Sequence, residues 1–347
     1  MKRLKNRVKN SIRISWLRLV LRVPFLPGLH YLLFSRAFDR ELRGVIAGHL
    51  AFERNSANTE KSNYSLRRNI HRIEKGLIMR PRRDNFAAGY IQDVVESYIA
   101  GRDSLNESEL NWAYEVLCEY FSVAGGHKSI DKARARFEQR PGITRGYHAN
   151  TGAHKPHLRD LSNAPPVTLD ALKALSVRRR SVRWFSQEPV PREYIDRAIE
   201  VASLAPSACN RQPFQYRIFD QPDLVQQVAA LPMGIKGYGE NIPAVAVLVG
   251  RLRAYPHPRD RHVIYIDASL SAMAFMYALE TMGLASCPIN WPDIPEREKA
   301  MKSLLGLADD ERPVMLVAIG YPDPQGLVPG SSKVPVSDLR TYNSIAK

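Results

Sequence analysis

Two short segments hold most of the side chains that could bind a charged ligand. The first, residues 178–183 with the sequence RRRSVR, places four arginines and a serine directly after leucines at helical spacing. Guanidinium groups bind phosphate oxygens in pairs, and a serine hydroxyl can add a further hydrogen bond. This segment is therefore either a binding site for a phosphorylated ligand or a basic turn exposed to solvent.

The second segment, residues 205–214 with the sequence APSACNRQPF, is a loop rich in hydrogen-bonding side chains between two prolines. It connects a predicted helix, which begins near Pro191 and carries apolar residues at helical spacing over 195–202, to a predicted strand over 214–219. Because the two segments lie at the two ends of one predicted helix, we predict that they contribute to one shared site.

Together these motifs carry a resemblance to a known family. RRSVRWF at 179–185, followed about 25 residues later by APSACNRQPF, resembles the opening of the FMN-dependent nitroreductase family. Supporting likenesses follow at residues 241–243 (NIP), 282–284 (MGL), 287–290 (CPIN) and 332–335 (SKVP), so that the resemblance covers about residues 169–343. It implies an obligate homodimer with one FMN in each of two sites at the dimer interface.

The resemblance also implies roles for individual residues. The FMN phosphate, ribityl chain and pyrimidine edge would be contacted by Arg179, Arg180, Ser181 and Arg183. The isoalloxazine ring would be lined, largely from the opposite subunit, by Pro206, Ser207, Ala208, Asn210 and Gln212. Pro288, Ile289 and Asn290 would pass by the flavin with a backbone N–H near N5, and Lys333 would reach the phosphate.

Two positions depart from the family pattern. Asn290-Trp291 stands where family members have Glu-Gly, and Ser331 stands where a second basic residue is common. The first departure bears on the substrate pocket more than on FMN binding, because the N5 contact comes from backbone. Trp291 and Tyr238 are either walls of that pocket or core side chains.

The expected chemistry does not require a catalytic side chain. A flavin accepts and delivers hydride itself, so the protein supplies binding, orientation and a donor to the reduced ring. The sequence contains no GxGxxG and no GxxxxGK[ST], which disfavours a separate Rossmann or P-loop nucleotide site. A nicotinamide donor, NADH or NADPH, would therefore stack on the flavin.

Other chemically suggestive residues have simpler explanations. His148, His154 and His157 lack a supporting cysteine or acid, so we expect solvated histidines and no metal site. Cys209 is expected to be a small buried thiol rather than a redox centre. The dense charges of residues 71–83 suggest either a helix end with ion pairs or a surface for an anionic ligand.

The organisation of the chain predicts a helical part followed by a part that contains both helices and strands. We expect a basic helical extension over 1–140, with Asn106 and Glu109 forming a helix capping box, a linker over 141–168 and a nitroreductase-like FMN-binding domain over 169–347. In that domain, apolar runs predict strands at 244–249 and 314–319, and small residues predict a buried helix at 263–282. Strands separated by helices indicate an α+β or α/β layered domain. The resemblance implies an α+β fold with a mainly antiparallel sheet flanked by helices.

Charge and composition bear on location. The 347 residues carry a net charge of +15, of which +13 lies before Pro165, and residues 1–38 hold nine basic residues and no acid. Their interleaved apolar residues predict either a cationic amphipathic helix on an anionic membrane or a helix docked on the protein. We expect no membrane-spanning segment, because the longest uncharged run near the N-terminus has 13 residues. Three cysteines without a pairing pattern indicate a reducing cytoplasm.

The sequence thus predicts a cytoplasmic, homodimeric FMN oxidoreductase. It would transfer hydride from NAD(P)H to an electron-poor acceptor such as a nitroaromatic, quinone or enone, or act on a dedicated pathway substrate. The alternative is a flavin-binding scaffold at a membrane surface, in an envelope or polysaccharide pathway. Nucleic-acid binding is disfavoured, because no recognised nucleic-acid-binding motif accompanies the positive charge.

Overall fold

The computed structural model describes residues 14–55, 63–139, 154–159 and 161–345. Its centre is a four-stranded antiparallel sheet with the strand order β1-β2-β4-β3. The strands are β1 (Phe214–Phe219), β2 (Ala244–Arg251), β3 (Ala285–Asn290) and β4 (Glu311–Gly320). The sequence predicted β1, β2 and β4, whereas β3 was noted for its motif but was not predicted as a strand.

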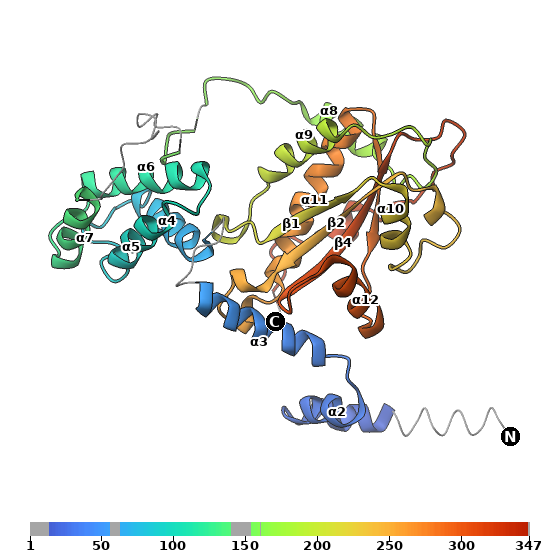
Figure 1. Cartoon of the computed structure of the whole chain (residues 1–347), viewed down its shortest axis with the longest axis horizontal. Helices are drawn as coiled ribbons and strands as arrows, with labels where there is room; N and C mark the ends of the chain where they lie inside the picture. Colours follow the sequence, from blue (N-terminus) through green and yellow to red (C-terminus); the bar gives the residue numbers. More distant parts are fainter. Residues whose placement is uncertain (1–13, 56–62, 140–153, 160, 346–347) are drawn as a thin grey trace.

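Helices cover both faces of this sheet, because alternate side chains of its strands point to opposite faces. On one face Ala246 and Leu248 of β2 pack with α9 (Arg192–Ser203) and α11 (Val263–Thr281). On the other face Val245 and Val247 pack with α10 (Pro222–Ala229) and α12 (Pro295–Leu305). The predicted α+β fold, a mainly antiparallel sheet flanked by helices, is confirmed (Figure 1).

The long helix α11 is a core helix. Its small residues Ala268 and Ala272 are buried against Ala198 and Ala202 of α9, as the sequence predicted. By length and composition the segment Pro258–Thr281 is apolar enough to cross a membrane, and half of its apolar 18-residue stretch is buried inside the protein. Its apolar character is explained by two packing partners, the sheet and α9. Gly283, with φ of +79°, follows the end of the helix in a conformation that suits glycine.

A second core lies in the N-terminal half. There α4 (Tyr64–Leu77), α5 (Ile91–Gly101), α6 (Glu107–Val123) and α7 (Lys128–Glu138) pack around fully buried side chains. The predicted cap of α6 is present, since the Glu109 N–H donates to Asn106 Oδ1 over 2.9 Å. We call residues 63–139 the helical unit; Figure 1 shows it beside the sheet domain.

The remaining elements connect or extend these two parts. Helix α3 (Asp39–Asn55) packs on the turn η3 (Leu252–Ala254), where Gly48 approaches Leu252 closely. Residues 14–22 are helical and pair with α2 (Leu26–Phe34) through a hydrogen bond from Trp16 Nε1 to His30 Nδ1 of 3.1 Å. The short elements are α8 (Leu169–Arg178), η1 (Ala208–Asn210), η2 (Gly239–Asn241), η4 (Pro258–Asp260) and α13 (Val336–Leu339). Residues 1–13 of the basic segment and residues 141–153 and 160 of the expected linker lie outside the described residues.

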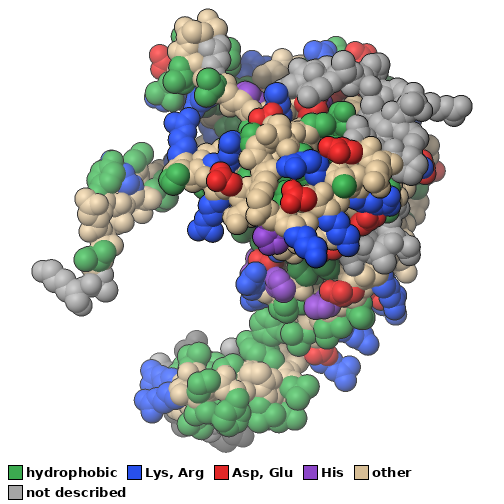
Figure 2. All heavy atoms as spheres, turned by 90° about the vertical axis from the view of Figure 1, so that its left-hand side faces the viewer, with side chains coloured by type: hydrophobic (Ala, Val, Ile, Leu, Met, Phe, Trp, Pro, Cys, Tyr) green, Lys and Arg blue, Asp and Glu red, His purple; other side chains and the backbone are tan. Residues whose placement is uncertain are grey.

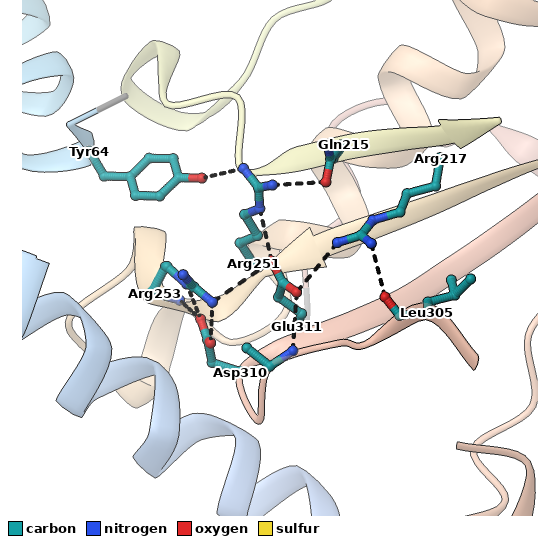
Figure 3. Close-up of polar contacts among 9 residues, drawn as sticks. Tyr64, Gln215, Arg217, Arg251, Arg253, Leu305, Asp310 and Glu311 are labelled. Atoms are coloured by element: carbon teal, nitrogen blue, oxygen red, sulfur yellow. Dashed lines mark hydrogen bonds and ion pairs between the residues drawn. The ribbon is translucent and has the colours of Figure 1, made fainter. Parts of the chain in front are cut away.

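A largely buried acid links β1, β2 and β4 to α4. Glu311 at the start of β4 lies 3.2 Å from Arg251 Nε, and Arg217 and Arg253 lie on its other sides (Figure 3). Arg251 in turn donates to the Tyr64 hydroxyl of α4 over 3.5 Å. The three arginines share the Glu311 carboxylate, and Arg251 also contacts Tyr64 of the helical unit.

Gly320 at the end of β4 lies in a tightly packed position. A Cβ there would lie 2.6 Å from Pro243 Cγ and 2.8 Å from Phe185 Cδ1. Because these atoms cannot move away freely, Gly320→Ala should lower the free energy of unfolding in urea by about 1–3 kcal/mol. Gly330→Ala, where a Cβ has no neighbour within 4 Å, is the control and should change it little. Equal effects would contradict this account.

Candidate active site

The first motif runs along the edge strand of the sheet. Arg179 caps the end of α8, and Ser181 then pairs with Ser286 of β3, whose carbonyl accepts a hydrogen bond of 3.1 Å from the Val182 N–H. Further along, the backbone of Phe185 exchanges two hydrogen bonds with the Asn241 side chain, of 2.6 and 3.1 Å. Residues 179–185 are thereby fixed to the sheet domain at both ends.

This part of the site offers hydrogen-bond donors without partners. Arg179 Nε and Ser286 Oγ are buried, and neither has a hydrogen-bond partner among the described residues. The Arg183 guanidinium lies 5.8 Å from the centre of the Tyr238 ring. Burial raises the pKa of the Cys287 thiol, while the nearby charges of Arg183 and Arg179 lower it. Unpartnered buried donors beside two arginines form a suitable environment for an anionic or strongly polar ligand.

The third predicted segment is the edge strand β3 itself. Pro288 and Asn290 are exposed, and Ile289 between them is buried. Trp291 is buried too, and its Nε1 donates to Glu298 Oε1 over 2.6 Å. Of the two interpretations of Trp291, the structure supports the core side chain, whereas Tyr238 lies beside the first motif.

The second motif has an unusual backbone. Cys209, Asn210 and Gln212 have φ between 50° and 54°, a region that residues other than glycine rarely adopt. The Gln212 N–H donates to Ser207 Oγ over 3.0 Å and the Ala208 N–H to Asp267 Oδ2 over 3.1 Å. Such a backbone persists only where surrounding contacts determine it, and these hydrogen bonds are part of that determination.

Asp267 supports this loop from inside the sheet domain. Its Oδ2 also accepts a hydrogen bond of 2.7 Å from the Tyr255 hydroxyl. Burial raises the pKa of the Asp267 carboxyl, and the hydrogen bonds from Tyr255 and from the Ala208 N–H oppose that rise. The carboxylate therefore holds the loop through its hydrogen bonds.

The helical unit holds the same loop from the other side through Arg67 of α4. Arg67 Nε donates to the Asn210 carbonyl over 2.8 Å, and its Nη2 donates to Gln212 Oε1 over 3.1 Å. Its Nη1 pairs with the buried Glu109 of α6 at 3.1 Å, and the guanidinium lies 5.2 Å from the centre of the Trp112 ring. One arginine thus joins α4 and α6 to a motif about 140 residues away in sequence.

A groove of about 550 Å³ lies where the helical unit meets the second motif. One wall comes from the helical unit, and the other comes from the end of α9 and the loop that follows. The sequence reasoning missed Arg67, Glu109, Trp112 and Asp267, because no motif links them to the loop. The one available signal was the density of charged residues near α4.

Within one chain the predicted site residues form separate groups. Residues 179–183 lie beside β3 with Pro288, Ile289 and Asn290, whereas residues 206–212 lie against α4 and Asp267. No hydrogen bond or ion pair among the described residues joins the two groups. Lys333 lies in the exposed segment after β4, away from contact with either group in the described interactions. The shared site therefore stays a prediction, which the resemblance completes with residues 206–212 of the opposite subunit.

The histidines and the cysteine that the sequence analysis singled out lie in ordinary structural contacts. The His154 N–H donates to Glu115 of α6 over 2.7 Å, and His148 lies outside the described residues. In the part of the chain that the structure describes, no group of three His, Cys, Asp or Glu is placed to hold a metal. Cys209, which the sequence suggested to be buried, is half-buried. His71 lies 3.0 Å from Glu74 within α4, so this segment contains an intrahelical pair.

The sheet domain matches the model of a known protein family. The model of the nitroreductase family matches residues 177–235 and 234–321, which include the first two motifs and the whole sheet. Residues 177–321 belong to the nitroreductase family. The helical unit lies outside the match, and so does Lys333.

The nitroreductase-family domain also accounts for the similarity to individual proteins. Iodotyrosine deiodinase 1 of Pongo abelii is 24% identical over 190 residues, which are 47% of this chain and 65% of that protein. NADH dehydrogenase of Thermus thermophilus is 29% identical over 189 residues, 46% of this chain and 89% of that protein. An FMN-dependent nitroreductase structure from Clostridium difficile aligns with a TM-score of 0.43 and 20% identity, over 49% of this chain and 98% of that one.

Arg67→Ala tests whether the helical unit holds the loop of the nitroreductase-family domain. Loss of charge-assisted hydrogen bonds worth about 1.5–3 kcal/mol should speed hydrogen exchange at the Ala208 and Gln212 amides at least about tenfold. Arg136→Ala, which removes an exposed pair with Glu96, is the control and should leave exchange in the loop unchanged. Unchanged exchange in Arg67→Ala would show that the loop is held without the helical unit.

Proposed function

We propose that this protein is an FMN-dependent oxidoreductase that transfers hydride from NAD(P)H to an electron-poor acceptor, such as a nitroaromatic, a quinone or an enone. The match of residues 177–321 to the nitroreductase family supports a flavin oxidoreductase in general. Relatives named for NADH dehydrogenase activity support a nicotinamide donor. No side-chain nucleophile is required, since a flavin carries the redox chemistry.

The observation that carries the proposal is the pair of unpartnered buried donors at the first motif. Arg179 Nε and Ser286 Oγ have no hydrogen-bond partner among the described residues, and Arg183 adds a positive charge beside them. These residues fit a phosphate-bearing cofactor. When bound there, FMN would supply the acceptance and delivery of hydride. Arg179, Arg180, Ser181 and Arg183 would hold its polar groups, and edge strand β3 would lie along it through residues 288–290.

We further propose that the active protein is a homodimer. The second motif is rigidly held yet lies apart from the first motif in the same chain, so a second copy is the natural source of the missing half of each site. Large apolar side chains are exposed on α8, α9 and α11, namely Leu172, Val201, Leu204, Ile266 and Leu270. Burial of such a surface in a symmetric interface would stabilise the dimer.

A second candidate reaction is reductive dehalogenation. Iodotyrosine deiodinases are among the similar proteins, and this chain covers 65% of the length of the one from Pongo abelii. A halogenated phenol is then an alternative acceptor for the same reduced cofactor. Reduction of the bound flavin followed by addition of each acceptor separates the two candidates, because both reactions begin from the reduced protein.

We propose that the protein is cytoplasmic and that its N-terminal part associates with the inner face of the membrane. The N-terminal hairpin, residues 14–34, has exposed apolar side chains at the end of the molecule (Figure 2). Leu21 and Leu32 are 80% and 74% exposed, and α2 has no buried residue. Basic residues such as Arg18 and Arg22 accompany them. An apolar surface with a basic border is suited to an anionic bilayer, and a scaffold role there remains the alternative function.

FMN binding can be tested at the first motif. Arg179→Ala and Arg183→Ala should each weaken FMN binding by about 1–3 kcal/mol, measured by fluorescence titration of the apoprotein, because each removes charge-assisted hydrogen bonds. Arg178→Ala, which removes an exposed arginine paired with Glu280 at 2.9 Å, is the matched control and should bind FMN normally. Unchanged affinity in both test variants would place the phosphate elsewhere.

The reaction is tested by anaerobic bleaching of the bound flavin. NADH or NADPH should remove the yellow colour, and addition of a nitroaromatic or a quinone should restore it. Restoration by iodotyrosine alone would favour the dehalogenation candidate instead. A protein that binds FMN and is not bleached by either donor would favour the scaffold.

Membrane binding is tested by co-sedimentation of the full chain with phosphatidylglycerol vesicles. Replacing Leu32 and Leu33 with serine should abolish most binding, because each buried leucine contributes about 1.5–3 kcal/mol. Replacing Leu158 and Leu161, which are even more exposed but lie in the segment before α8, is the control and should retain binding. A wild-type protein that stays in the supernatant would exclude this location.

A further inference from the structure

A groove between α3 and α12 contains no residue of either motif, and the proposed flavin chemistry does not use it. Its volume is about 620 Å³, which is within the usual range for sites that bind small molecules. Ile46 and Leu50 line it from α3, and Pro295 lines it from the start of α12. Leu307, just after α12, adds to this largely apolar lining. We call this cavity the α3–α12 groove.

Ion pairs hold the two sides of the groove together. Arg40 of α3 pairs with Asp293, and its Nη1 lies 2.6 Å from Glu298 Oε2 of α12. Because Glu298 is buried, this contact lies inside the protein and is shielded from solvent. A further pair joins Glu41 of α3 to Arg261 at 3.4 Å. Helix α3 is therefore attached to the sheet domain, and the groove is a built feature of the fold.

Cations without an acidic partner stand on both sides of the groove. Arg43 of α3 and Lys299 of α12 line it and are exposed, and neither forms an ion pair within the described part of the chain. Arg312, which also lines the groove, is 5% exposed, and its Nε has no hydrogen-bond partner among the described residues. An apolar groove with cations on both sides is complementary to a molecule that has an apolar chain and an anionic group.

The acidic residues that line the groove do not neutralise Arg43 and Lys299, because other cations already pair with them. These pairs are Glu298 with Arg40 and Arg312, Asp309 with Lys302, and Glu311 with Arg251. The groove therefore has an excess of positive charge, which favours an anion.

An exposed apolar stripe leads from the groove toward the N-terminal hairpin. Leu42, Ile46 and Leu50 follow one another at intervals of four residues along α3 and are 61%, 62% and 51% exposed, so they share one face of the helix. Only residues 35–38 separate α3 from the hairpin, and α3 lies between α2 and the sheet domain (Figure 1). If the hairpin lies on the membrane, as proposed above, lipid is close to the groove.

We propose that the α3–α12 groove binds one anionic lipid molecule, with its acyl chain against Ile46 and Leu50 and its headgroup between Arg43 and Lys299. An acyl chain matches the apolar lining, and a phosphate-type headgroup accepts charge-assisted hydrogen bonds from both cations. Such a lipid attaches α3, and with it the sheet domain, to the bilayer in addition to the hairpin. This inference deepens the proposed membrane location and is independent of the flavin chemistry.

Binding of a soluble anionic amphiphile tests the groove without a membrane. The full chain is titrated by calorimetry with dodecyl phosphate below its critical micelle concentration, at constant ionic strength. Wild-type protein should bind it, whereas Ile46→Ser should bind it at least about tenfold more weakly, because an apolar contact with the chain is lost. Leu42→Ser is the matched control and should bind normally, since Leu42 is as exposed as Ile46 on the same helix face but does not line the groove.

The headgroup contact is tested by removing the two cations. Arg43→Gln with Lys299→Gln should bind dodecyl phosphate at least about tenfold more weakly, because charge-assisted contacts are lost. Lys299→Gln alone repeats the test if the double variant does not fold. The control is Arg54→Gln, which removes an exposed cation at the end of α3 that does not line the groove. Dodecyl maltoside, which has the same chain and an uncharged headgroup, should bind equally to wild-type protein and to the double variant.

Several results of these titrations would overturn the proposal. Absence of dodecyl phosphate binding by the wild-type protein is one, and equal affinity in Ile46→Ser and Leu42→Ser is another. Inorganic phosphate that binds as tightly as dodecyl phosphate would show a site for a free anion. A dimer that dissociates in Ile46→Ser but not in Leu42→Ser, measured by sedimentation equilibrium, would show that the groove is an interface between two copies of the chain.

Failure of this proposal can be distinguished from failure of the proposed membrane location. Wild-type protein that binds dodecyl phosphate but does not co-sediment with phosphatidylglycerol vesicles would support the groove and overturn the location alone. Wild-type protein that co-sediments with the vesicles but does not bind dodecyl phosphate would overturn the groove alone. FMN binding should be the same in wild-type protein and in Ile46→Ser, because the groove contains no residue of either motif.

Discussion

The contact on which the arrangement of this protein depends is Arg67 with the second motif. Its guanidinium contacts the Asn210 carbonyl, the Gln212 side chain and the buried Glu109 at once. The loop needs such a support, because three of its residues adopt a backbone conformation that is unfavourable for side chains other than glycine. Asp267 holds the loop from the sheet side, so it is fixed between two cores.

This contact gives the helical unit a role in the site. The unit has its own buried core and would need no sheet domain to bury its apolar side chains. Its polar residues on α4 are nevertheless directed toward the second motif, where Arg67 binds the loop and Tyr64 approaches Arg251 (Figure 3). The groove between the two parts is a consequence of that arrangement.

The pattern of the sequence was sufficient to predict most of the sheet domain. Strands at 214–219, 244–249 and 314–319 and the helix at 263–282 follow from apolar periodicity, because local burial dictates them. Strand β3 was not predicted, since its six residues alternate weakly and contain a proline, which an edge strand tolerates. Trp291 could equally well have been a pocket wall, and only its hydrogen bond to Glu298 showed that it belongs to the core.

By itself the sequence determined the family of the sheet domain and the two motifs, because both are read from contiguous residues whose types match a chemistry. Tertiary structure alone decided what surrounds them. Arg67 of α4 and Asp267 of α11 reach the second motif from two distant elements, and no local pattern records such long-range contacts. It also separated the two motifs within one chain, because β3 holds the first and α4 holds the second.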